Sequence, residues 1–467
     1  MHFERVLKFG GAGLADGPAV EHACDLIRDH GGKRPVVVVS AHQGVTELLD
    51  TVVRAAAQGL IEGDRVRIRH RTLLRQLGLD SDLLDRHFTE LFVLLEGIRA
   101  RWRFSPEERD LALSYGERMS ARVVAHALRS RGIHATPVDA FDLGLFTDSN
   151  FGNAAPSLES LTGVKESLEE VTGVPVVTGF VGKDRAGNLT TLGRNGSDLT
   201  AALIAEAVGA GELHLWKTVG GMMTADPKLV PDARVIDRLG FDEAAEYAFH
   251  GAEILHAAAL APAKRGGVLV RVLDVNHPEA EGTLIEERSG EHGVVGIAAR
   301  KRVTRLMLTI PAGGDRSVYT ATFFGALADQ RIECGPVRMG HDRISVLVAP
   351  STNLERAVAA LGPRARQESE FALVALIGRE ANHDAQVGAR AQSVLADCGV
   401  EIYEAHTGSR ERSQAFLVRA QDLERAVRAL HGAFLRRQIS LSGAGGAERP
   451  VGARAAAART VGTQIGE

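Results

Sequence analysis

The sequence predicts an open α/β sheet with helices on both faces, followed by two small α+β units. Three observations support this prediction. Aliphatic runs such as residues 36–39 are typical of strands that are buried on both faces of a parallel sheet. A segment with helical spacing, residues 19–30, separates the first two runs, as in a βαβ unit. In the second half, the order strand, helix, strand, strand, helix occurs twice, which indicates an internal repeat.

The first half alternates strands and helices. A helix start is predicted at Ser105-Pro106, where a capping serine precedes a proline and two acidic residues. The sheet is expected to end near Ile285. Its strands are predicted at 6–9, 35–39, 135–138, 175–180, 212–216 and 268–272, and residues 47–131 are expected to be largely helical.

Each copy of the repeat in the second half fits a small ferredoxin-like sandwich. The tail from about residue 440 is rich in Ala, Gly and Arg, and we expect it to be disordered. The predicted domains are 1–290, 300–365, 366–438 and the tail 439–467. Strands are predicted at 305–310, 332–339, 344–348, 371–377, 400–405 and 414–418, and helices at 318–327, 353–361, 385–395 and 423–435.

The composition is that of an ordinary soluble protein. Of 467 residues, 45% are hydrophobic and 24% charged, and the formal net charge of -4 gives no basic field for nucleic acid. The 3 cysteines are far apart and predict neither a disulfide framework nor a zinc site. The aliphatic runs are too short to span a membrane, and residues 1–5 lead straight into the first predicted strand, so we expect no signal peptide. We therefore expect a cytoplasmic protein.

The first motif is Lys8-Phe9-Gly10-Gly11, at the end of the first predicted strand. Glycines let the backbone approach a ligand closely, and the amides that follow can converge on phosphate oxygens. The lysine adds a compact positive charge. The motif predicts a phosphate site at the carboxyl end of the strand, and the alternative is a tight turn that only leads into a helix.

Two further segments carry candidate ligands for a small molecule. Ser40 and Thr46 follow the second strand, where ligands of open α/β sheets sit, and the alternative is that they only cap a loop and a helix. Glu117 lies in a helical region and can bind an ammonium group. Its alternative is a solvated ion pair with Arg118.

Two more turns follow later strands. In residues 190–198, Ser197 and Asp198 are expected to cap a helix from about Leu199, and Arg194 offers a fork for a carboxylate. The turn at 216–227 comes after another strand, and its alternative is a hairpin without a ligand. The alternative for the Arg194 turn is a loop that binds no ligand.

Taken together, these segments resemble the aspartate kinases of the amino-acid kinase family. The resemblance is collinear and extends to about residue 435. The repeats resemble ACT domains, which in this family bind end-product amino acids and mediate dimers. The matching segments are 8–11, 40–46, 116–120, 146–154, 192–198 and 282–285.

The resemblance implies ATP-dependent phosphorylation of the side-chain carboxylate of L-aspartate. Lys8 would neutralise the moving phosphoryl group, and Asp198 would orient Lys8 or a Mg²⁺ ion that enters with the nucleotide. Arg194 would bind the substrate α-carboxylate and Glu117 its ammonium. The reacting carboxylate would be positioned by Ser40, Thr46 and Ser197. Backbone amides for the phosphates would come from Gly10, Gly11, Gly193 and Gly196. The segment that binds the nucleotide would contain Lys217, Thr218, Met223 and Lys228.

The nucleotide side departs from the family pattern. Lys217, Thr218, Met223 and Lys228 stand where the family has Thr, Asp, Tyr and Arg, and Glu253 stands where the family has a lysine that reaches the nucleotide. Three accounts follow: Lys217 supplies the missing charge, the pocket takes another nucleotide or an altered ATP pose, or the domain binds an amino acid without phosphoryl transfer.

An active kinase is the leading hypothesis, because Lys8, Arg194, Glu117 and Asp198 are all retained. The alternatives are a kinase for another amino acid in a specialised pathway and a non-catalytic amino-acid sensor. Loops at 313–315 and 378–382 are candidates for an amino-acid effector site, and a homodimer or higher homo-oligomer is expected.

Overall fold

The structure is a computed structural model that describes residues 3–251, 255, 257–287, 293–379, 381, 384–407 and 412–435. The described part belongs to one compact unit that ends at Leu435. Glu253 and the predicted tail lie outside the described residues. No helix in the described part is long and apolar enough to cross a bilayer.

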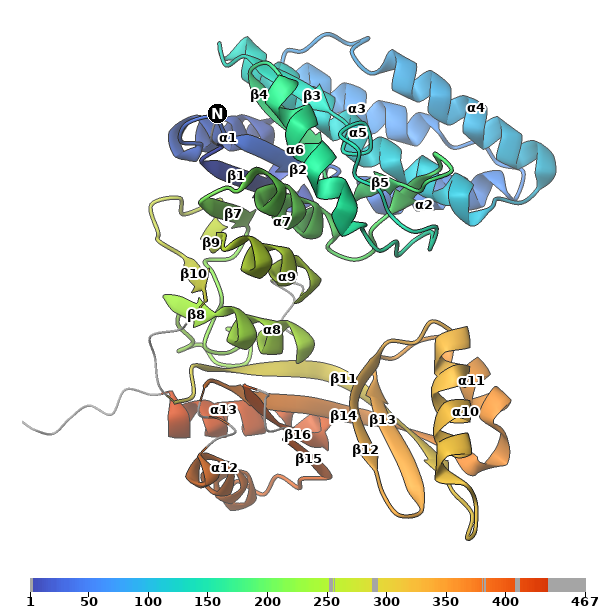
Figure 1. Cartoon of the computed structure of the whole chain (residues 1–467), viewed down its shortest axis with the longest axis vertical. Helices are drawn as coiled ribbons and strands as arrows, with labels where there is room; N and C mark the ends of the chain where they lie inside the picture. Colours follow the sequence, from blue (N-terminus) through green and yellow to red (C-terminus); the bar gives the residue numbers. More distant parts are fainter. Residues whose placement is uncertain are drawn as a thin grey trace, which may run out of the picture. The chain divides into compact units, whose positions relative to one another are not determined.

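The N-terminal half forms an eight-stranded sheet in the order β3-β4-β2-β1-β7-β9-β10-β8 (Figure 1). Its strands pair in parallel except for β10, which is antiparallel to β9. The predicted open, mostly parallel sheet is confirmed. The strands are β1 Arg5–Phe9, β2 Val36–Val39, β3 Ala135–Val138, β4 Val174–Thr178, β7 Glu212–Lys217, β8 Arg238–Gly240, β9 Leu269–Asp274 and β10 Thr283–Glu286, beside a small hairpin of β5 Val181–Lys183 and β6 Leu189–Thr191.

Helices cover both faces of this sheet, as the buried strands require. Val36 and Val38 enter one hydrophobic cluster, whereas Val37 and Val39 enter another on the opposite face. α5 begins as predicted, because Ser105 and Glu108 form a reciprocal capping box. The helices are α1 Gly17–His30, α2 Val45–Ala56, α3 Asp64–Gln76, α4 Asp85–Arg101, α5 Pro106–Ser130, α6 Leu161–Glu170, α7 Gly196–Val208, α8 Phe241–Phe249 and α9 Ala257–Gly266.

The C-terminal half contains the repeat twice, but both copies share one antiparallel sheet in the order β12-β13-β11-β14-β16-β15. β11 begins at Gly296 rather than at the predicted 305, because its first residues pair with the end of β14. The elements are β11 Gly296–Thr309, α10 Arg316–Asp329, β12 Cys334–Met339, β13 Arg343–Val348, α11 Leu354–Leu361, β14 Ala365–Ile377, α12 Ala385–Asp397, β15 Glu404–Thr407, β16 Ser413–Arg419 and α13 Leu423–Phe434.

Hydrogen bonds connect the two halves of the chain. Ser413 at the start of β16 donates to Glu246 of α8 at 2.7 Å and bonds the ring of His250 at 2.9 Å. Thr224 bonds His431 of α13 at 3.0 Å. The segment after β7 is therefore in direct contact with the second copy of the repeat.

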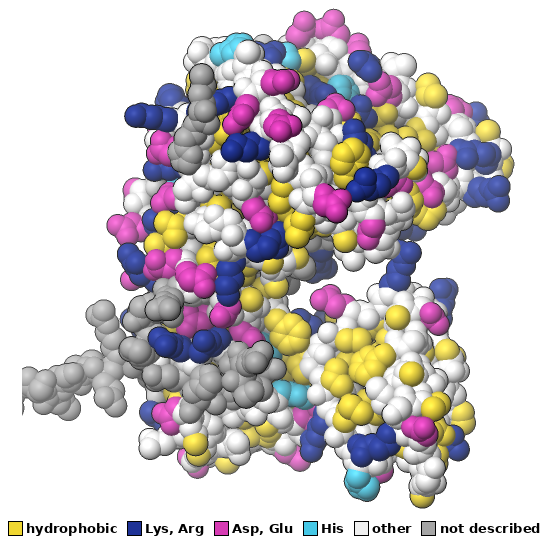
Figure 2. All heavy atoms as spheres, viewed as in Figure 1, with side chains coloured by type: hydrophobic (Ala, Val, Ile, Leu, Met, Phe, Trp, Pro, Cys, Tyr) yellow, Lys and Arg dark blue, Asp and Glu magenta, His cyan; other side chains and the backbone are white. Residues whose placement is uncertain are grey.

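Charges of both signs are interspersed over the face drawn in Figure 2. This face carries no broad patch of lysine and arginine, in keeping with the net charge of -4.

Candidate active site

The carboxyl ends of four neighbouring strands meet at one edge of the first sheet. β1 lies between β2 and β7, with Phe9 opposite both Val39 and Trp216, and β4 continues the row beyond β2. The residues at and just beyond the ends of these strands are thereby brought together, among them Gly10, Ser40 and Lys217. Ligands of open α/β folds bind at such an edge.

A buried carboxylate joins two lysines at this edge. Lys8 Nζ lies 2.6 Å from Asp198 Oδ1, and Lys217 Nζ lies 2.6 Å from Asp198 Oδ2. Val6 and Leu215 belong to the same face of the sheet, so strand alternation directs both lysines toward α7, which carries Asp198. Lys217 thus places a second positive charge beside Lys8.

The two neighbouring lysines favour the ionised form of the Asp198 carboxylate. Burial alone would raise the pKa of Asp198, but the charges of Lys8 and Lys217 outweigh burial and hold that pKa below its usual value. Burial and the neighbouring charge of Lys8 lower the pKa of Lys217, while Asp198 acts in the opposite direction. One negative charge between two positive ones leaves a net positive site for a phosphate.

The Gly10-Gly11 turn is built for close approach. A Cβ on Gly11 would lie 2.8 Å from the carbonyl oxygen of Ala41, so only glycine fits where the turn packs against the segment after β2. A Cβ on Gly10 would lie 3.5 Å from Lys8 Nζ, which places this turn beside the ammonium. The turn continues into a short 3₁₀ helix, and α1 begins only at Gly17.

The second glycine turn corrects two expectations. α7 begins at Gly196 after Asn195, which has a left-handed φ of 57°, so Ser197 and Asp198 lie in its first turn and do not cap it. The amide of Gly196 donates to the carbonyl of Gly193 at 3.0 Å, so Gly196 supports the turn and does not offer this amide to a ligand. Arg194 is exposed, and within the described chain it makes no hydrogen bond or ion pair.

Glu117 is a buried carboxylate with one free oxygen. Its Oε1 accepts from the amide of Ala41 at 3.0 Å, whereas Oε2 is buried and has no hydrogen-bond partner among the described residues. Burial raises the pKa of Glu117 to about 8. The solvated pair with Arg118 does not form, because Arg118 contacts Glu90 instead.

The predicted hydroxyls lie along the same edge. Ser40 is half-buried, and its amide donates to Phe9 O at 3.1 Å. Thr46 is the second residue of α2, which Gly44 precedes without a side-chain cap, so the capping alternative is wrong for Thr46. Ser197 is buried against Gly179, where a Cβ would lie 2.5 Å from Ser197 Cβ.

The sequence alone did not single out Asp110, a buried carboxylate on α5. Its Oδ2 accepts from the amides of Gly152 at 2.8 Å and Thr191 at 2.7 Å. Gly152 belongs to the segment 146–154, one of those that resemble the family, and Thr191 precedes the Arg194 turn. The only signal was its position seven residues before Glu117, on the same side of a helix.

In the described structure, the other residues predicted to bind the nucleotide after β7 make no hydrogen bond or ion pair with Lys8 or Asp198. Thr218 is exposed, and Met223 forms an isolated bridge with Val235. Lys228 is exposed, and no described contact joins it to Lys8 or Asp198. Of the residues in this segment, only Lys217 is bound to the Asp198 carboxylate.

The part of the chain that the structure describes contains no cluster of three side chains suited to hold a metal. Both oxygens of Asp198 face lysine ammonium groups, which makes this carboxylate a poor ligand for Mg²⁺. The arrangement fits Mg²⁺ that is held by the nucleotide's phosphates.

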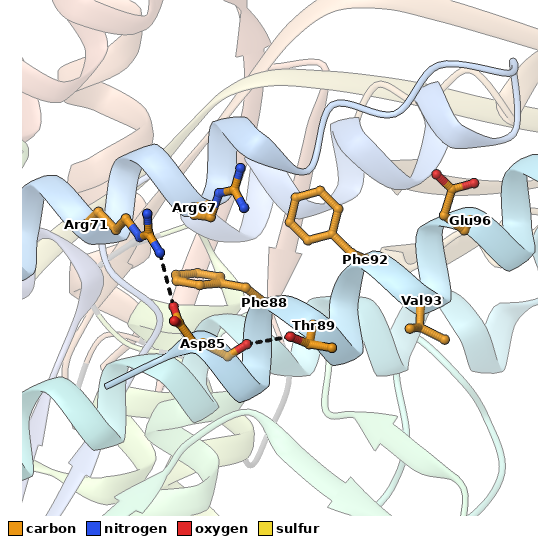
Figure 3. Close-up of a pocket in the computed structure, with 8 residues that line it drawn as sticks. All are labelled: Arg67, Arg71, Asp85, Phe88, Thr89, Phe92, Val93 and Glu96. Atoms are coloured by element: carbon orange, nitrogen blue, oxygen red, sulfur yellow. Dashed lines mark hydrogen bonds and ion pairs between the residues drawn. The ribbon is translucent and has the colours of Figure 1, made fainter. Parts of the chain in front are cut away.

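An open groove lies away from this edge, between α3 and α4 (Figure 3). Its charged groups are already engaged: Arg71 lies 3.3 Å from Asp85, and Arg67 packs over the ring of Phe92. It shares no lining residue with the predicted site.

Comparison with known proteins places this arrangement in a family. The model of the amino acid kinase family matches residues 4–274, and an ACT-domain model matches residues 374–434. The chain therefore belongs to the amino acid kinase family.

The relatives place the chain more closely. It is 32% identical to the lysine-sensitive aspartokinase 3 of Escherichia coli (strain K12), over 91% of this chain and 98% of the relative. It is 30% identical to the chloroplastic aspartokinase 2 of Arabidopsis thaliana, over 92% of this chain and 84% of the relative. The solved structure of E. coli aspartokinase III in complex with aspartate and ADP matches with a TM-score of 0.80 and 31% identity, covering 92% of this chain and 99% of that one. Within its family the chain groups with the aspartokinases, which confirms the predicted fold and the predicted carboxyl-directed kinase.

Proposed function

We propose that this chain transfers the γ-phosphoryl group of ATP to the side-chain carboxylate of L-aspartate. The product is 4-phospho-L-aspartate, which leads toward amino acids of the lysine, threonine and methionine type. A carboxylate oxygen attacks the γ-phosphorus, the bond to the β–γ bridging oxygen breaks, and ADP leaves with that electron pair. The observation that carries the proposal is the Lys8–Asp198–Lys217 trio at the sheet edge.

The trio addresses the main barrier, which is bringing two anions together. Phosphoryl transfer needs in-line positioning and neutralisation of the charge on the transferring group. Lys8 and Lys217 supply two ammonium groups, and Asp198 fixes both without needing to move during the reaction. In this assignment Lys217 provides the second cation that the family pattern places at the position of Glu253. Gly10, Gly11 and Gly193 keep the backbone close to the phosphates.

The amino-acid-binding half of the site holds the two groups of aspartate that do not react, its ammonium and its α-carboxylate. The free Oε2 of Glu117 takes the substrate ammonium, because a buried carboxylate oxygen without a partner gains most from a cation. Arg194 is exposed and unpaired among the described residues, so its guanidinium is available for the α-carboxylate. Ser40, Thr46 and Ser197 then orient the reacting carboxylate.

Mg²⁺ enters with ATP and neutralises its phosphates when bound. Regulation is assigned to the C-terminal sheet, where an amino-acid effector would bind. The E. coli relative has been solved with lysine and aspartate in a T-state, which supports an effector of this class. A homodimer remains the expected assembly, and the loops at 313–315 remain a candidate effector contact.

One assay tests the proposed function. Purified protein, ATP, Mg²⁺, aspartate and hydroxylamine should yield aspartyl hydroxamate, because hydroxylamine traps an acyl phosphate. Hydroxamate formation from another amino acid, or with GTP in place of ATP, would shift the substrate assignment. No hydroxamate with any pair, together with intact aspartate binding, would favour an amino-acid sensor.

A further inference from the structure

We propose that Asp110 is a positioning residue that sets the geometry of the aspartate-binding half of the site; this inference rests on the proposed function. Its carboxylate Oδ2 receives two backbone amides, from Gly152 at 2.8 Å and from Thr191 at 2.7 Å. The two amides come from segments that are far apart in the sequence. One buried oxygen therefore holds both segments against α5.

The two tethered segments also contact each other. The amide of Ala154 donates to Thr191 O at 2.9 Å, and a Cβ on Gly193 would lie 2.4 Å from the side-chain oxygen of Asn153. Gly193 has a φ of 74°, a conformation that favours glycine. The Arg194 turn thus rests on the 150–154 loop, and Asp110 fixes both where they meet.

α5 acts as a common support for the substrate side. Asp110 and Glu117 are seven residues apart and project from the same side of the helix. Asp110 binds Gly152 and Thr191, whereas Glu117 binds the amide of Ala41. Two carboxylates on one helix thereby set the relative positions of three segments: 40–46, 150–154 and 191–198.

A carboxylate suits this task better than a neutral side chain. Hydrogen bonds from amides to an ionised oxygen are shorter and stronger than bonds to a neutral one. Asp110 is 1% exposed, and its Oδ1 has no hydrogen-bond partner in the described structure. Burial raises the pKa of this carboxyl, and the amides of Gly152 and Thr191 act in the opposite direction by favouring the ionised form. A purely structural position would be filled at lower desolvation cost by an uncharged residue.

Loss of the Asp110 hydrogen bonds should weaken the binding of one substrate and not of the other. Thr191 lies three residues before Arg194, so loss of the Asp110 bond should displace the guanidinium that binds the α-carboxylate. Within the described structure, Lys8 and Lys217 make no hydrogen bond or ion pair with Asp110 and are held by Asp198. Aspartate binding should therefore suffer while nucleotide binding does not.

The test compares Asp110→Asn with Asp85→Asn, which removes an exposed acid at the start of α4. Asp110→Asn should raise the KM for aspartate at least tenfold and leave the KM for ATP within about twofold, a split that mere loss of stability does not produce. Aspartate binding is also measured by calorimetry, which remains informative if the wild type forms no hydroxamate. Asp85→Asn should match the wild type.

Either of two results would overturn the proposal: unchanged aspartate affinity in a folded Asp110→Asn variant, or equal losses for both substrates. If Asp110→Asn does not fold, Asp110→Ser replaces it, since serine leaves room for a water that can bond the same amides. Failure of both variants to fold would assign Asp110 to structural support alone.

Discussion

Replacing Lys217 by methionine removes one of the two cations on Asp198 and keeps most of the side-chain volume. Lys217 Nζ lies 2.6 Å from Asp198 Oδ2, and its side chain is 17% exposed, so solvent screens the charge only in part. Lys8 stays in place on the other oxygen. The variant therefore isolates the second positive charge without dismantling the site.

Two magnitudes follow. If Lys217 stabilises charge on the transferring phosphoryl group, its loss should lower kcat about 10²–10³-fold, the range seen when one preorganised donor is removed. The free energy of unfolding should fall by about 1.5–3 kcal/mol, the contribution of a hydrogen bond to a charged group. The larger cost of an uncompensated buried charge is avoided, because Lys8 still neutralises Asp198.

Hydroxamate trapping gives kcat, and chemical denaturation gives the free energy of unfolding. The matched control is Lys165→Met, which removes an exposed lysine from α6 and should leave both quantities unchanged. A kcat for Lys217→Met within threefold of the wild type, with the expected loss of stability, would refute the catalytic assignment and leave Lys217 as a structural partner of Asp198.

Other predictions concern the remaining groups. Burial raises the pKa of Glu117 to about 8, so in the free enzyme this carboxyl is mostly protonated at neutral pH. The kcat/KM for aspartate should therefore rise about tenfold or more from about pH 6.5 to 8.5. A flat profile in the wild type, or the same rise in Glu117→Gln, would contradict this prediction. Lys8→Ala should abolish turnover and leave calorimetric aspartate binding nearly intact, whereas equal loss of both would argue against a phosphoryl-group ligand. Arg194→Ala should raise the KM for aspartate about tenfold or more, as expected for loss of a charge-assisted bond, and an unchanged KM would exclude that contact. Ser105→Ala should lower stability by about 1 kcal/mol through loss of the α5 cap, to be checked by thermal unfolding against Ser81→Ala.

Local patterns predicted the sheet and much of its site. The run at 36–39 is typical of a strand buried on both faces, and the glycine turns mark places where two backbone segments pack closely. Lys8 could be located near the end of a predicted strand and Lys217 directly after one, but their meeting on Asp198 depends on strand order. That order, with β7 beside β1, is a tertiary property that no local pattern contains.

Other features required contacts between distant segments. Asp110 follows two glutamates and an arginine, so in sequence it looks like part of a solvated helical face. Its burial depends on amides from Gly152 and Thr191, which are not visible from α5 alone. The predicted start of α7 is wrong for a related reason: Asn195 takes a left-handed conformation in place of the extended one usual before a helix, and the helix begins at Gly196.

The shared C-terminal sheet has a consequence for how this chain can be divided. β11 and β14 pair from Gly296–Ile377 at one end to Leu308–Ala365 at the other, with each strand central in the sheet. Expression of either repeat alone would expose a long strand edge whose amides and carbonyls have lost their partners, a template for aggregation. The predicted domain boundary near residue 365 is therefore a poor place to divide the chain. A fragment that begins before Gly296 and retains α13 is the smallest regulatory fragment that keeps β11 and β14 paired.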